Sequence, residues 1–108
     1  MKIRRLGEYE LTWRWDEPPD DLRRFLWDEL HEAVHAHDLG LTQKLCGLLD
    51  LVDRYYLWKD RRDHSVSETY ENDFGHATED ENEFAIIIED PVSWRVQQWL
   101  QDAEEAQR

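Results

Sequence analysis

The feature that most restricts the fold of this chain is a pair of apolar stripes between Asp20 and Trp58. In both halves of this stretch, apolar residues recur at intervals of three and four, which is the period of one side of an α-helix. Gly40 lies between the halves, where a helix end is expected. The pattern predicts two packed helices, a helical hairpin, at the centre of the fold. The first stripe comprises Leu22, Phe25, Leu26, Leu30, Ala33 and Val34, and the second comprises Leu45, Leu48, Leu49, Val52, Tyr55 and Tyr56.

The second of these helices is apolar on more than one side. A helix of this kind has to be covered by several neighbouring elements. Its lone Cys46 cannot form an internal disulfide, so we expect a small buried hydrophobe there. Gly47 lowers the intrinsic stability of the helix. The residues that widen its apolar stripe are Leu41, Cys46, Leu51, Leu57 and Trp58.

The N-terminal stretch has the pattern of a β-strand. From Tyr9 to Trp15, aromatic and aliphatic residues alternate with polar ones, as they do in a half-buried strand. We expect Trp13 and Trp15 to belong to the core. Residues 2–6 are expected to form a short preceding strand that turns at Gly7.

A second strand is predicted at Phe84–Ile88, because this run is mainly β-branched or aromatic. We expect it to pair with the N-terminal strand. The segment 65–83 before it is compatible with a helix or a loop. Ser65 and Glu68 have the spacing of a capping box, and Gly75 stands where a C-cap would follow, so the pattern favours a short helix.

The C-terminal segment predicts a third helix. Asp90 followed by Pro91 is a common helix start, because Asp can cap and Pro loses no useful donor in the first turn. Trp94 falls opposite the apolar stripe, so we expect an exposed tryptophan, a residue type that is enriched at binding interfaces. The stripe itself consists of Val92, Val96, Trp99, Leu100 and Ala103.

These elements predict an α+β fold: an N-terminal strand or hairpin and one later strand, packed against a central helical hairpin and a C-terminal helix. A length of 108 residues suits one domain, spanning residues 1–108 with an acidic segment, 63–90, inside it. No apolar stretch approaches the roughly 20 residues that span a bilayer. Residues 1–8 lack the pattern of a signal peptide. We therefore expect a cytoplasmic protein that does not enter membranes.

The net charge of −13 is concentrated in one third of the chain. Residues 63–94 contain ten acidic side chains and no lysine or arginine, whereas residues 1–62 carry 13 acidic and 11 basic side chains, a balance of −2. This clustering favours a specific electrostatic role, with a solvated acidic loop as the alternative. It disfavours direct binding of nucleic acid, which needs clustered lysine and arginine.

The charge distribution predicts a non-enzymatic module that binds a basic surface of another macromolecule, such as a toxin or a nucleic-acid-binding enzyme. In charge and size the chain is similar to immunity proteins and to phage-type inhibitors that imitate nucleic-acid charge. Carboxylates would steer the partner, and exposed aromatic residues would supply desolvated contacts. An accessory structural subunit is a further alternative. The candidate contact residues are Glu71, Asp73, Glu79, Asp80, Glu81, Glu83, Tyr70 and Trp94.

One catalytic pattern is present in the first long helix. His31, Glu32 and His35 fit H-E-x-x-H, which resembles the zincin metallopeptidase signature. By that resemblance the two histidines bind Zn²⁺ and Glu32 acts as the general base. The longer metzincin form is not followed, because Asp38 replaces its glycine and Leu41 its third ligand. A minimal zinc hydrolase is the enzymatic alternative, and a chance match to a short pattern is the other explanation.

Overall fold

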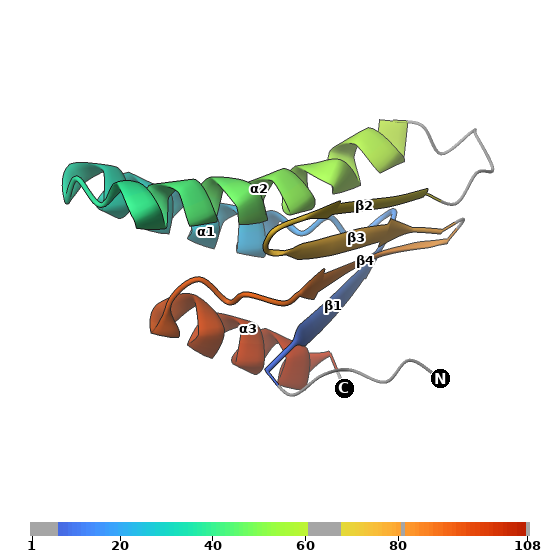
Figure 1. Cartoon of the computed structure of the whole chain (residues 1–108). Coiled ribbons are helices and arrows are strands. Elements are labelled where there is room, and N and C mark those ends of the chain that lie inside the picture. Colours follow the sequence, from blue (N-terminus) through green and yellow to red (C-terminus); the bar gives the residue numbers. More distant parts are fainter. Residues whose placement is uncertain (1–6, 61–67, 81, 108) are drawn as a thin grey trace.

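The computed structural model describes residues 7–60, 68–80 and 82–107; the strand predicted at residues 2–6 lies outside these ranges. The strands of the described part form one antiparallel sheet in the order β1-β4-β3-β2. The predicted α+β class is confirmed. Figure 1 shows the α1–α2 pair near β2 and β3, and α3 beside β1. In chain order the elements are β1 (Tyr9–Arg14), α1 (Asp20–His35), α2 (Leu39–Asp60), β2 (Glu68–Asn72), β3 (Gly75–Glu79), β4 (Glu83–Ile88) and α3 (Trp94–Ala106).

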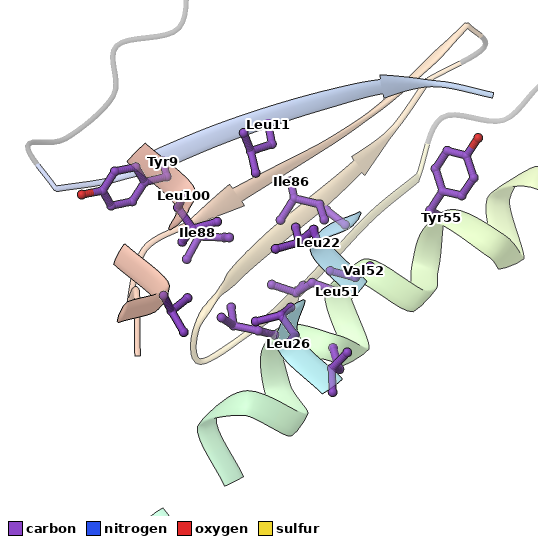
Figure 2. Packing of buried hydrophobic residues seen from close by; sticks show 14 of the residues in the cluster. Tyr9, Leu11, Leu22, Leu26, Leu51, Val52, Tyr55, Ile86, Ile88 and Leu100 are labelled. Atoms are coloured by element: carbon purple, nitrogen blue, oxygen red, sulfur yellow. The ribbon is translucent and has the colours of Figure 1, made fainter. Parts of the chain in front are cut away.

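The N-terminal strand pairs with the strand at residues 83–88, as the sequence predicted. β1 and β4 pair antiparallel, with Tyr9 opposite Ile88 and Leu11 opposite Ile86. Directly opposed residues share a face, so these four side chains point to the same side of the sheet. There they pack with side chains of the helices, including Leu100 of α3 (Figure 2). No described residue of the opposite face belongs to this core cluster, although Ile87, which lies on that face of β4, is 5% exposed.

The connection between α1 and α2 consists of residues 36–38 and ends before Gly40, where the sequence predicted it. His37 has a φ of 57°, the left-handed geometry that often ends a helix, and the next N–H, of Asp38, donates to the Ala33 carbonyl at 3.0 Å. The Asp38 carboxylate then caps α2 by accepting the N–H of Leu41 at 3.1 Å. Gly40 therefore lies in the first turn of α2, not at the junction.

Residues 68–79 fold as a β-hairpin, not as the short helix that the spacing from Ser65 favoured. β2 and β3 pair antiparallel around a two-residue turn, Asp73–Phe74; residues 65–67 lie outside the described ranges. Gly75, predicted as a helix C-cap, begins β3 instead. A Cβ at this position would overlap the Ile87 carbonyl of the neighbouring strand, which explains the need for glycine.

α2 is fastened to both ends of the hairpin. Near its middle, the side-chain amide of Asn72 donates to the Gly47 carbonyl at 2.9 Å, and near its end the Trp58 indole donates to the Asp80 carbonyl at 2.8 Å. Gly47 also has a packing role, because a Cβ there would overlap the ring of Phe74. The helix thereby sets the positions of the β2–β3 turn and the β3–β4 turn.

Several residues of the predicted apolar faces are exposed, and Val34 of α1, expected in the core, is one of them at 55%. Trp15 follows the last residue of β1 and keeps 43% of its surface accessible, because the strand has ended before it. Cys46 is exposed on α2, as is Leu57 at 48%, because the apolar residues of α2 occupy more of its circumference than its neighbours cover. The prediction that several elements cover this helix is otherwise confirmed, since α2 contacts α1, β2, β3 and β4.

α3 begins later than the Asp90–Pro91 pair predicted. Val92 has a φ of 69°, outside the helical region, so a helix cannot run through it. Ser93 is the N-cap in its place, and its hydroxyl accepts the N–H of Val96 at 3.3 Å.

The far end of α3 protects the outer edge of β1. The Glu104 carboxylate accepts the N–H of Glu10 at 2.7 Å. The Gln107 side-chain amide accepts the N–H of Thr12 and donates to its carbonyl, both at 3.0 Å. Side chains thus replace a fifth strand, which blocks pairing with another chain at this edge.

Candidate functional site

Acidic side chains from two separate segments gather around the β2–β3 turn. The Phe74 carbonyl joins these segments by accepting the N–H groups of Glu89 at 2.9 Å and Asp90 at 3.1 Å. Glu71 lies opposite His76 in the hairpin, and the His76 Nδ1 is 3.9 Å from the Glu89 carboxylate. We call this group the acidic turn surface, and its members are Glu71, Asp73 and Glu89, which are exposed, and Asp90, which is half-buried.

The predicted contact residues do not form one continuous patch. Asp80 and Glu83 are exposed at the β3–β4 turn, whereas Asp73 lies at the opposite end of β3. The five residues of this strand separate the two turns by roughly 14 Å. Glu81 lies outside the described residues. The acidic segment therefore presents charge at two ends of the hairpin, and Glu89 and Asp90 add to one of them.

Two of the predicted contact residues are turned toward α2. Glu79 is 3% exposed, and the guanidinium of Arg54 lies 3.7 Å from its carboxylate, so a partner cannot reach it in the folded protein. Burial on the inner face of β3 thus removes Glu79 from the candidate contacts. The Tyr70 hydroxyl donates to Asp50, and this hydrogen bond, ahead of burial, raises the pKa of Tyr70. Arg54 also lies 4.7 Å from the centre of the Tyr70 ring.

Trp94 is exposed, as predicted, with 77% of its surface accessible. It borders a pocket of about 280 Å³ where the end of α1 and the starts of α2 and α3 meet. We call this the junction pocket. A second hollow, of about 370 Å³, lies beside it and shares Glu29, Glu32 and Arg95 with it. The remaining lining residues of the junction pocket are Ala33, Ala36, Asp38, Leu41, Leu45 and Ser93.

An ion pair between a buried carboxylate and an exposed guanidinium links α1 to α3 where the two hollows meet. Glu29 is 8% exposed, and its carboxylate lies 3.0 Å from the Nε of Arg95. Burial raises the pKa of Glu29, and the opposing effect of Arg95 is smaller. Glu29 was not among the predicted site residues, although its position carried a signal. It follows Leu22 by seven residues and precedes Ala33 by four, so it lies on the apolar stripe of α1.

The H-E-x-x-H stretch lies on the exposed side of α1. The rings of His31 and His35 are 4.6 Å apart between centroids, while the Glu32 carboxylate lies 3.7 Å from a guanidinium nitrogen of Arg95. Among the described residues, no group of three or more His, Cys, Asp or Glu side chains is arranged to hold a metal ion. A catalytic zinc site needs three protein ligands. Two imidazoles fit part of such a site, and the zinc-hydrolase alternative stays a prediction.

No protein-family model, curated protein or solved structure matches this chain. Of the helices in the described part, none is both long enough and apolar enough to cross a membrane. The features of the chain that bear on its function are the acidic turn surface, the junction pocket and the charge distribution.

Proposed function

We propose that this chain is a non-enzymatic binding module that recognises a basic surface of another macromolecule. The acidic turn surface carries the proposal. It holds three exposed carboxylates and one half-buried carboxylate, in a segment of the sequence that contains no lysine or arginine. Such an array creates a directional negative potential, which attracts and orients a positively charged partner.

The placement of these charges supports a role in binding more than a role in solubility alone. Like charges held close together destabilise a folded protein, and solubility needs only net charge. Here the backbone contacts of Phe74 draw the two acidic segments together, and the packing of its ring on Gly47 fixes the turn to α2. A rigid arrangement of this kind loses little conformational entropy when a partner binds.

The partner that fits best is a protein with a basic groove, such as a toxin or a nucleic-acid-binding enzyme. A groove that binds nucleic acid is lined with lysine and arginine for contact with phosphates. Carboxylates held on a hairpin can occupy the same positive potential without being nucleic acid. This supports a role as an inhibitor or immunity protein.

The proposal is tested by binding kinetics against a panel of purified basic nucleases and an acidic control protein. For a nuclease that binds with 1:1 stoichiometry, we expect the association rate to fall about tenfold or more as the salt concentration rises from about 0.05 to about 0.5 M. A triple variant, Glu71→Gln, Asp73→Asn and Glu89→Gln, should slow association several-fold at constant salt.

The control is a triple variant with the same change in net charge at exposed sites elsewhere: Glu17→Gln, Asp102→Asn and Glu105→Gln. We expect it to change the association rate much less, because its carboxylates lie outside the acidic turn surface. A third variant, with Asp80→Asn and Glu83→Gln, reports on the β3–β4 turn. Association that does not depend on salt, or equal effects of the two triple variants, would refute the proposed role of this surface.

A further inference from the structure

We infer that the junction pocket receives one lysine or arginine side chain of the basic partner. This inference rests on the proposed function and assigns it an anchor site. The acidic turn surface would attract the partner over a distance, and the pocket would hold one of its side chains in contact.

The walls of the pocket suit the hydrocarbon stem of a long basic side chain. Ala33, Ala36, Leu41 and Leu45 line it together with the exposed Trp94. Lysine and arginine bury their methylene groups against apolar surface while the charged group seeks a polar partner. A pocket of about 280 Å³ has room for one long side chain but not for a helix or strand.

The charge of the lining favours a cation. Three carboxylates and one guanidinium border the pocket, a balance of −2. Arg95 lies closer to Glu29, at 3.0 Å, than to Glu32, at 3.7 Å, and 68% of the Glu32 side-chain surface is accessible. Glu32 can therefore accept hydrogen bonds from an incoming amine or guanidinium. The Trp94 ring offers a cation–π contact at the mouth of the pocket.

Two helix N-termini also border the pocket, and these would favour an anion. Each carries a partial charge of about half a unit, so together they leave the balance of the pocket negative. Both are already capped by side chains, Asp38 on α2 and Ser93 on α3. The net field in the pocket consequently selects a positive group.

The junction pocket lies within reach of the acidic turn surface along the chain. Three residues separate Asp90 from Trp94, a span of at most about 14 Å. Within this connection the left-handed geometry of Val92 turns the chain before α3 begins. A short basic segment that meets the turn can extend to the pocket.

The first test is a titration with N-acetyl-arginine amide at constant ionic strength, followed by the indole N–H and backbone amide signals in ¹H–¹⁵N NMR spectra. The Trp94 indole signal is assigned with a Trp94→Phe variant. We expect saturable shifts for Trp94, Ala36 and their neighbours, and none with N-acetyl-norleucine amide, which has the stem without the charge. Glu32→Gln should raise the dissociation constant about threefold to fivefold, as for a single solvent-accessible ion pair.

Ala36→Phe fills the pocket from the exposed end of α1, and Ala106→Phe makes the same change at the exposed end of α3, away from the pocket. Only the first should abolish the saturable shifts and raise the dissociation constant for the basic nuclease. No saturable shift, or equal effects of the two variants, would overturn the inference. If the acidic-turn triple variant still slows association in that case, the proposed function stands without the pocket; if it does not, both fail.

Discussion

The substitution Gly47→Ala separates what local propensity predicts from what the tertiary structure predicts. Gly47 lies inside α2, where alanine is intrinsically more favourable than glycine by about 1 kcal/mol. Propensity alone therefore predicts a more stable protein. The structure places the ring of Phe74 where the new Cβ would be, with two ring carbons well inside van der Waals contact distance.

The ring has to move, and its displacement has an energetic cost. Overpacking of this kind typically costs about 1–3 kcal/mol. Set against the gain in helix propensity, the net effect of Gly47→Ala should lie between zero and a loss of about 2 kcal/mol in unfolding free energy. In a Phe74→Ala background the clash is absent, so the same substitution should stabilise the protein by about 1 kcal/mol.

The assay is a double-mutant cycle from urea denaturation of the four proteins. We expect a coupling energy of about 1–3 kcal/mol between the two positions. Gly40→Ala is the matched control in the same helix, because a Cβ there would meet only the Asp38 side chain, at an ordinary 3.8 Å, and should stabilise the protein in both backgrounds. Equal stabilisation by Gly47→Ala with and without Phe74 would show that the turn does not pack on α2 as described.

Two further predictions concern α1. The raised pKa of Glu29 means that folding favours its protonated form, so this contribution to stability is fully present below the ordinary value of 4.5 and is lost as the pH rises through the higher folded value. The difference in unfolding free energy between the wild type and Glu29→Gln should therefore favour the wild type more at a pH of about 4 than at about 7. A difference that does not change with pH would contradict the burial of this carboxylate. For the zinc alternative, elemental analysis of untagged protein dialysed against buffer should find well under one zinc per chain, since the described residues supply two imidazoles of a three-ligand set. Close to one zinc per chain, lost in a folded His31→Ala, His35→Ala variant, would instead support a metallohydrolase.

The sequence alone was sufficient to predict an element where the spacing or type of its apolar residues fitted a helix or a strand but not both. Two long helical stripes, the alternating stretch from Tyr9 and the β-branched run Phe84–Ile88 correspond to α1, α2, β1 and β4. In each of these elements, hydrophobic burial and local geometry favour the same structure. The pairing of β1 with β4 was predicted because a strand needs a neighbouring strand for its backbone hydrogen bonds.

The hairpin of β2 and β3 was missed because its signal was ambiguous. Val66, Tyr70 and Phe74 recur at intervals of four, a spacing that keeps residues on one side of a helix but also, being even, on one face of a strand. A strand gains its hydrogen bonds only from a neighbour, here β4 beside β3. That neighbour is not visible in the local sequence, and tertiary pairing decided the outcome.

The amino-acid sequence by itself determined the number of long helices, the strands near the two ends and the segment that carries the excess negative charge. These depend on periodicity and composition, which are local properties. The tertiary structure decided which carboxylates are available for binding: it buried Glu79 against Arg54, brought Glu89 and Asp90 to the turn at Phe74, and placed Trp94 over a pocket lined by the ends of three helices. Exposure and proximity depend on contacts between residues distant in the chain, because each buried charge needs a partner that only the folded protein can supply.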